Sequence, residues 1–157
     1  DILHRCKTSR INIFEKIKSV TSQFDLHTCK DDLDVSYLSK KEKNLFVATL
    51  KNRNLLEKSL KELNKEKVDP IYFGELLNQQ HRILRDDLNV STKKIESMLS
   101  ASKQAGAFGG KINGSGGGGC MFAYAPDNPK KVADAIESVG GRAYIIGKDE
   151  GTKILFK

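Results

Sequence analysis

A run of glycines occupies the stretch INGSGGGGC, residues 112–120, with five glycines among the six residues from Gly114 to Gly119. Without β-carbons, successive backbone N–H groups in such a run can converge on one anion, for example a phosphate. Each ordered glycine costs about 0.5–1 kcal/mol relative to alanine. The run matches neither the Walker loop nor the dinucleotide fingerprint. It favours a loop whose backbone adopts φ > 0 or closely approaches a ligand.

The position of the run favours a loop over a flexible linker. Only 38 residues follow Gly119, too few for an independent domain without disulfides or a metal. A linker at this point would join a sheet to its own neighbouring strand. We therefore interpret residues 114–119 as a loop inside one fold, and a hairpin with a purely structural glycine tip remains the alternative.

Helical signals fill the first two thirds of the chain, where apolar residues recur at a spacing of three and four. A long helix opens with a capping box, because Ser39 and Glu42 stand three residues apart. Another opens with Asp69 as N-cap and Pro70 at the first helical position. The predicted helices begin at or near Arg10, Ser39, Asp69 and Ser91, and the last of them stops near Gly106.

The hydrophobic period then changes, and four short segments are predicted as strands: Phe108–Asn113, Cys120–Ala125, Arg142–Ile146 and Thr152–Phe156. A helix from Asn128-Pro129 to Gly140-Gly141 separates the second strand from the third. This order is typical of an α+β, ferredoxin-like sandwich, an antiparallel sheet with helices on one face. We expect a single domain over residues 1–157, with a long helical part (1–90) before the glycine-loop part (91–157).

Four other side chains could take part in chemistry. His81 lies on or near the buried face of its helix, where a hydrogen-bonded structural histidine is favoured over a substrate contact. Lys111, on the strand entering the loop, could face a phosphate. Ser115 could add a hydroxyl donor or only stabilise the turn. Cys120 is better explained as a small buried packing residue than as a reactive thiol, since nothing nearby in sequence would activate the thiol.

Composition excludes several classes of protein. Apolar residues make up 38% and charged residues 30%, as in a packed protein and not a disordered one. The net charge of +7 is spread in proportion to length, and aromatic residues are only 7%, so we expect no specific nucleic-acid binding. No apolar run would span a membrane, and no signal peptide is evident. The three cysteines suggest reduced thiols and a cytoplasmic location, and no metal site is predicted.

The stretch SKQAGAFGGKINGSGGGGC resembles the third motif of the GHMP small-molecule kinases, and LLNQQHRILRDDLNVST, residues 76–92, is similar to a stretch of galactokinases. The segments ATLKNRNLLEKSLKEL and KTSRINIFEKIKSV resemble helices of galactokinase more loosely. Galactokinases usually have Phe at the position of Gly117. A loop made of glycine alone is more similar to other sugar kinases, such as heptose phosphate kinases.

The resemblance implies the C-terminal domain of a sugar kinase that transfers the γ-phosphoryl of ATP to a sugar hydroxyl with the help of Mg²⁺. The family's substrate motif, its phosphate-wrapping motif and its catalytic aspartate belong to an N-terminal domain and are not found in this sequence. ATP and Mg²⁺ would be bound mainly there, so we assign no catalytic residue here and expect the chain alone to be inactive. The resemblance places the phosphate and substrate loop at Gly114, Ser115, Gly116, Gly117, Gly118 and Gly119.

Two alternatives belong to other functional classes. One is a non-catalytic ligand-binding or regulatory module on the same scaffold, and the other is a nucleic-acid-binding ferredoxin-like domain. A serine-rich phosphate loop upstream of this sequence would indicate a kinase. Which sugar and which hydroxyl would be phosphorylated does not follow from the sequence.

Overall fold

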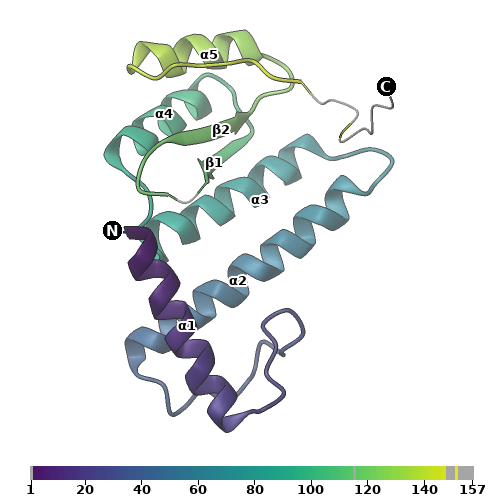
Figure 1. Cartoon of the computed structure of the whole chain (residues 1–157). Helices are drawn as coiled ribbons and strands as arrows, with labels where there is room; N and C mark the ends of the chain where they lie inside the picture. The colour runs from purple at the N-terminus through teal and green to yellow at the C-terminus, as the bar shows by residue number, and fades with distance from the viewer. Residues whose placement is uncertain (1, 115, 148–150, 152–157) are drawn as a thin grey trace, which may run out of the picture.

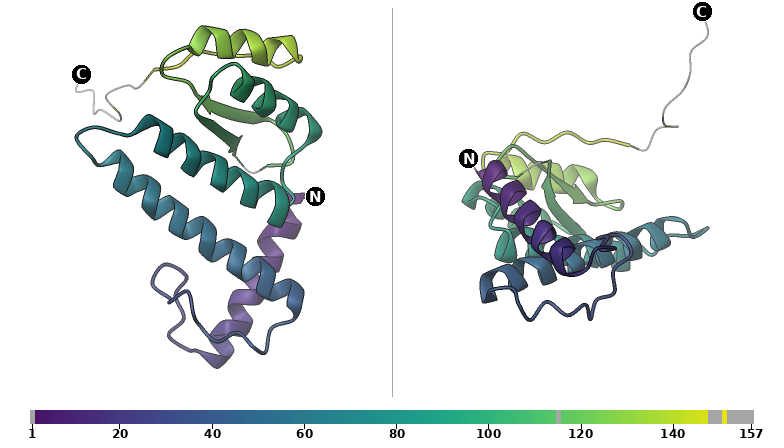
Figure 2. Two further views of the ribbon diagram at one scale, coloured as in Figure 1. Left: turned by 180° about the vertical axis from the view of Figure 1, so that it is seen from behind. Right: turned by 60° about the horizontal axis from the view of Figure 1, so that its bottom comes forward.

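The computed structural model describes residues 2–114, 116–147 and 151, without the side chains of residues 2, 3, 5 and 6. Helices α2 and α3 form an antiparallel pair, α1 crosses one end of α2, and a β-hairpin carries α4 and α5 at the far side of α3 (Figures 1 and 2). The elements are α1 (Ile2–Val20), α2 (Lys40–Leu63), α3 (Pro70–Arg82), the π-helical turn η1 (Ile83–Asp87), α4 (Lys93–Gln104), β1 (Gly109–Asn113), β2 (Cys120–Tyr124) and α5 (Pro129–Ser138).

The helix starts follow the capping signals of the sequence. Ser39 and Glu42 form the complete capping box of α2. The Asp69 carboxylate accepts the N–H groups of Ile71 and Tyr72 at the start of α3. Thr92 caps α4, so this helix begins just after the predicted Ser91. The first helix, by contrast, starts well before the predicted Arg10.

Helix α5 ends as predicted, at a pair of glycines. Gly140 has a φ of +76°, which a residue with a side chain rarely adopts. The Gly141 N–H donates to the Ile136 carbonyl and the Gly140 N–H to that of Glu137. Asn128 precedes the helix, but its side chain makes no capping hydrogen bond.

The prediction of a strand at Arg142–Ile146 is wrong. Residues 141–147 form irregular chain, with Tyr144, Ile145 and Ile146 exposed. The segment has the β-branched and aromatic residues of a strand, but a strand also needs a neighbour to accept its backbone hydrogen bonds. Here the chain runs along α5 instead, and the Ala143 N–H donates to the Glu137 carboxylate. The predicted strand Thr152–Phe156 lies outside the described residues.

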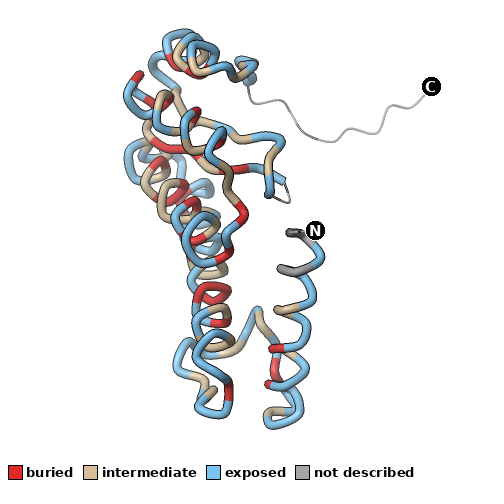
Figure 3. Tube along the Cα trace, turned by 90° about the vertical axis from the view of Figure 1, so that its left-hand side faces the viewer, coloured by how far each residue is buried: buried red, intermediate tan, exposed pale blue. Residues whose placement is uncertain are grey.

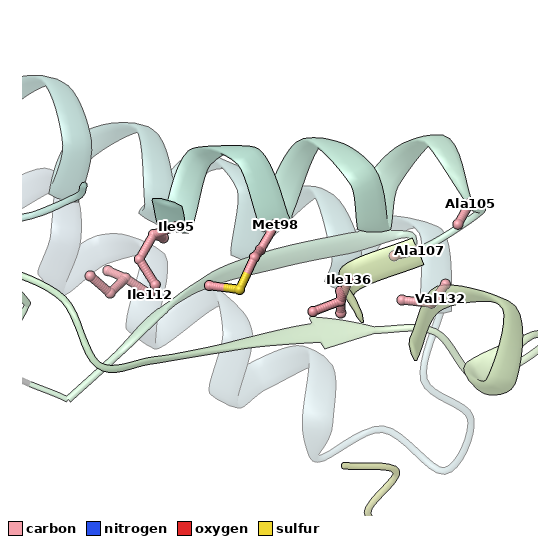
Figure 4. Packing of buried hydrophobic residues seen from close by; sticks show 7 residues of the cluster. All are labelled: Ile95, Met98, Ala105, Ala107, Ile112, Val132 and Ile136. Atoms are coloured by element: carbon pink, nitrogen blue, oxygen red, sulfur yellow. The ribbon is translucent and has the colours of Figure 1, made fainter. Parts of the chain in front are cut away.

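Strands β1 and β2 pair antiparallel, from Gly109 opposite Tyr124 to Asn113 opposite Cys120. They are the two strands of the sheet in the described part of the chain. The α+β arrangement with helices packed on a small antiparallel sheet is therefore confirmed. Buried side chains of α4, of the connection from α4 to β1, of β1 and of α5 meet over one face of this hairpin (Figure 4): Ile95, Met98, Ala105, Ala107, Ile112, Val132 and Ile136.

Two further clusters hold the helical part together, and buried positions follow the helix contacts through the whole fold (Figure 3). One joins α1 to α2 through Ile13, Ile17 and Phe46. The other joins α2 to α3 and η1 through Leu55, Leu76 and other residues. The helices therefore form a stable base on which the hairpin and its glycine loop are mounted.

Acid should weaken the contact between α1 and α2. The Lys16 ammonium, together with the Ser39 hydroxyl and N–H, lowers the pKa of the Glu42 carboxyl from 4.5 to about 2. A depressed folded-state pKa contributes stability that is present above the unfolded value and is lost as the pH falls through the folded value. We therefore expect the Tm difference between the wild type and Glu42→Gln to shrink between pH 4.5 and about 2.

Thermal melts at stepped pH would measure this difference. Glu57→Gln, at an exposed position on the same helix, controls for the loss of one negative charge. A Tm difference that stays constant through the acid range would contradict the assignment of the low pKa to Glu42.

Candidate functional site

The glycine loop has the backbone that its composition predicts. Gly114, Gly116, Gly117 and Gly119 have φ values between +78° and +86°, and Gly118 has +135°. Residues with a β-carbon rarely adopt these values, because the side chain collides with the backbone. The expectation of φ > 0 is therefore confirmed for all five glycines. Ser115 lies outside the described residues. The prediction that Cys120 is a buried packing residue is wrong: it is exposed, because it pairs with Asn113 at the end of the hairpin next to the loop.

The loop is docked on the segment between η1 and α4. The Gly117 N–H donates to the Val90 carbonyl at 2.6 Å. A β-carbon on Gly116 would lie 2.5 Å from the Val90 Cβ and 3.0 Å from its carbonyl oxygen. Only glycine allows this approach without displacing one of the two segments. Val90 is therefore the contact that fixes the loop against the helical part.

The rest of the loop leaves donors unused. Among the described residues, the backbone N–H groups of Gly116, Gly118 and Gly119 donate to no acceptor. A β-carbon on Gly114, Gly118 or Gly119 would meet nothing within 4 Å in the described structure. The loop therefore combines a dock on Val90 with backbone N–H groups that donate to no described acceptor.

Helix α3 lies along the edge of β1 that faces away from β2 (Figure 1). The Asn78 amide donates to the Phe108 carbonyl and accepts the Gly110 N–H, each at 3.2 Å. The Ile112 N–H donates to His81 Nδ1 at 3.3 Å. These two side chains form hydrogen bonds with the backbone groups along the edge of β1, as a third strand would. They hold the strand that leads into the glycine loop.

Two glycines allow this close approach of helix and strand. A β-carbon on Gly109 would lie 1.9 Å from the Gly74 carbonyl oxygen, and one on Gly74 would lie 2.5 Å from the Phe108 carbonyl carbon. Gly74, Asn78 and His81 follow one another at spacings of four and three, so they share one face of α3. That spacing was a signal in the sequence for a helix–strand contact, and our sequence analysis missed it.

His81 lies beneath the strand, at the edge of a hollow of about 220 Å³ that Asn78, Arg85 and Glu96 also line. Its side chain is buried, Nδ1 accepts from β1, and Nε2 lies 2.8 Å from Glu96 Oε1. Because Nδ1 accepts a hydrogen bond, the proton is on Nε2, which donates to Glu96. This is the arrangement expected of a structural histidine.

Lys111 extends over a neighbouring aromatic ring. Its ammonium lies 5.5 Å from the centre of the Phe122 ring, directly across the hairpin. Burial lowers the pKa of the Lys111 ammonium. Lys111 alternates along β1 with Ile112, so it lies on the face opposite the α4–α5 core. A contact between Lys111 and phosphate stays a prediction.

The described part of the chain shows neither a metal-binding cluster nor a membrane-spanning helix. The described residues contain no group of three His, Cys, Asp or Glu side chains that could hold a metal ion. Within the same residues, no helix is both long and apolar enough to cross a bilayer. A hollow of about 610 Å³ reaches Asn89, next to Val90, and its lining mixes polar residues such as Lys40 and Asp86 with the apolar Leu45 and Leu88.

A family model described as "GHMP kinases C terminal" matches residues 52–142, which include α3, α4, the glycine loop and α5. The chain belongs to the GHMP kinase C-terminal family. This agrees with the resemblance seen in the sequence. The match covers the loop, its dock on Val90 and the α3 residues that hold β1.

Curated relatives of this GHMP domain include kinases of two kinds. It is 47% identical over 96 residues to the mevalonate kinase of Thermococcus onnurineus, covering 60% of this chain and 28% of that protein. The mevalonate kinase of Pyrococcus abyssi is 49% identical over 73 residues, covering 46% and 22%. A galactokinase of Clostridium perfringens is 40% identical over 84 residues, covering 53% and 20%. The chain thus spans about a quarter of the length of these relatives.

A solved structure supports the same fold. The Lactococcus lactis galactokinase, crystallised with galactose, superposes with a TM-score of 0.66 at 25% identity, over 85% of this chain and 37% of that protein. The similarity therefore extends beyond the family match into the helical part. The fold is that of a GHMP kinase C-terminal domain.

Proposed function

We propose that the protein containing this domain transfers the γ-phosphoryl of ATP, with Mg²⁺, to a hydroxyl of a small molecule. The observation that carries the proposal is the glycine loop of a GHMP kinase domain with open N–H donors at Gly116, Gly118 and Gly119. Phosphoryl transfer depends mainly on positioning and on stabilising charge at phosphate oxygens. Backbone donors held in a fixed loop supply both.

In this proposal, residues 114–119 contact phosphate oxygens or the phosphate-binding segment of a second domain. The second domain supplies the catalytic base and most ligands of ATP and Mg²⁺. A cytoplasmic location would give the enzyme access to ATP, and we propose it on that ground.

Mevalonate is the first candidate for the acceptor. The relatives named mevalonate kinase share 47–51% identity with this chain, against 40% for those named galactokinase. A sugar remains the second candidate, since the galactokinase structure covers 85% of the chain. The glycine at position 117, where galactokinases usually have Phe, also favours an acceptor other than galactose.

A panel of acceptors would test this function. The full-length protein is incubated with ATP and Mg²⁺ and, separately, with mevalonate, galactose and other sugars, and ADP release is followed. We expect release with one acceptor well above the rate without acceptor. Release with none of them would favour the non-catalytic ligand-binding module.

The 157-residue chain alone is expected to fold but to release no ADP above background with any acceptor. The reason is that this sequence lacks the family's substrate motif, its phosphate-wrapping motif and its catalytic aspartate. Circular dichroism and thermal melts would establish folding, and the same ADP assay would measure activity. The full-length protein is the positive control. Turnover by the short chain would show that this domain contains a catalytic site of its own.

A further inference from the structure

The glycine loop is held at two places. The strand that leads into it, β1, is held at Ile112 by His81 of α3. The far part of the loop is held at Gly117 by the Val90 carbonyl. These anchors come from different segments, and their relative position decides the direction in which the open N–H groups of the loop point.

Both anchors lead to one carboxylate oxygen. His81, which accepts the Ile112 N–H, donates through Nε2 to Glu96 Oε1 at 2.8 Å. Ser91, the residue after Val90, donates its hydroxyl to the same Oε1. Glu96 lies in the first turn of α4, a third element of the fold. A single oxygen therefore connects β1, the Val90 dock and α4.

The surroundings keep this carboxylate in place. The second oxygen, Oε2, accepts from Arg85 at 3.3 Å, and Arg85 is held in turn by both carboxylate oxygens of Asp86. Burial raises the pKa of Glu96, but the hydrogen bonds from Ser91, His81 and Arg85 outweigh burial and hold the pKa below its ordinary value. Glu96 is therefore ionised at neutral pH and accepts all three hydrogen bonds.

We propose that Glu96 is a positioning residue for the glycine loop, which fixes the two anchors relative to each other through Ser91 and His81. Its effect on turnover rests on the phosphotransfer function proposed above. Its effect on the loop does not, because the contacts are present without any ligand. A charge-assisted hydrogen bond is about twice as strong as a neutral one, so a carboxylate suits this place better than an amide.

The test compares three variants of the full-length protein. Glu96→Ala removes the carboxylate that connects the two anchors of the loop. Glu96→Gln retains an acceptor oxygen but turns an amide N–H₂ towards Arg85 or the two donors. Ser91→Ala removes only the Val90 side. Asp31→Ala is the matched control, because this carboxylate also binds two side chains, Arg53 and Asn54, but lies away from the loop.

Two measurements are made on each variant: hydrogen exchange of the peptide over residues 112–120 without ligand, and kcat and KM for ATP with the acceptor found active. We expect Glu96→Ala to increase loop exchange, with no change in α2 or α5, and to lower kcat by about 10²-fold, the cost of a small misplacement near the reacting groups. Ser91→Ala should lower kcat by about tenfold, as for one lost hydrogen bond. Glu96→Gln should fall between Glu96→Ala and the wild type, and Asp31→Ala should match the wild type in both measurements.

Each result decides between the alternatives. Unchanged loop exchange in Glu96→Ala would overturn the proposal, as would exchange that rises equally throughout the domain, because Glu96 would then act on the fold as a whole. If the wild type phosphorylates no acceptor, the proposed function fails, while a loop-specific rise in exchange still supports the positioning role. Loop-specific exchange with unchanged kcat and KM would overturn the link between loop position and turnover.

Discussion

Gly116→Val is expected to lower the turnover of the full-length protein by about 10²-fold, which corresponds to ~2.7 kcal/mol of transition-state stabilisation. A β-carbon at this position would lie 2.5 Å from the Val90 Cβ, and the residue has a φ of +86°. The loop must leave Val90 to accommodate the side chain, and its N–H groups then change direction. The helical part does not depend on the loop, so the fold should survive.

Gly118→Val changes the backbone conformation of the loop without touching its contact with Val90, so it tests the two effects separately. A β-carbon there meets nothing within 4 Å in the described structure, but the φ of +135° is unfavourable for valine. If the open backbone binds phosphate, this variant should also lose about 10²-fold in turnover, with its Val90 contact intact. Turnover per folded molecule, measured alongside thermal melts, is the required quantity.

The two glycine variants distinguish three roles of the loop. A flexible linker predicts normal turnover and normal Tm in both. A purely structural hairpin predicts a lower Tm and an activity that follows the folded fraction. A phosphate-side loop predicts low turnover in fully folded protein. Normal turnover in both variants would remove the loop from the active site.

Gly109→Ala should have the largest effect on stability. The new β-carbon would lie 1.9 Å from the Gly74 carbonyl oxygen and 2.7 Å from the Gly74 Cα. These are backbone atoms, which cannot rotate away as a side chain can, so α3 must separate from β1. We expect a loss of about 3 kcal/mol, at the upper end of the cost of overpacking, and a Tm lower by about 6–12 °C.

A matched glycine serves as the control for this variant. Gly147→Ala adds the same methyl group where nothing in the described structure lies within 4 Å. Its Tm should stay close to that of the wild type. Equal melting of the two variants would mean that α3 and β1 do not approach as closely as the structure shows.

The elements that the sequence predicts well are those set by neighbouring residues. The capping box at Ser39 and Glu42 and the Asp69-Pro70 start act within one helical turn, so a pattern is sufficient to find them. The hairpin around the glycine run is equally local. The segment Arg142–Ile146 has the composition of a strand, but its state depends on a partner elsewhere in the chain, which no local pattern reports.

In the candidate site, too, the local features can be predicted from the sequence and the contacts between distant segments cannot. The glycine run identifies the loop, because few other roles need five residues with φ > 0 in so short a stretch. The dock on Val90 and the meeting of His81 and Ser91 on Glu96 depend on distant segments coming together. The spacing of Gly74, Asn78 and His81 signals the contact of α3 with β1, but it signals neither the dock nor the meeting on Glu96. Sequence reasoning therefore finds the loop but not the residues that orient it.

The contact of α3 with β1 also governs how the sheet can grow. An unprotected strand edge offers a template to which a second molecule can add a strand, and such addition leads to aggregation. Asn78 and His81 already occupy the backbone groups of Phe108, just before β1, and of Gly110 and Ile112 within it. A foreign strand would have to displace a whole helix there. A strand from another molecule would therefore have to add beside β2.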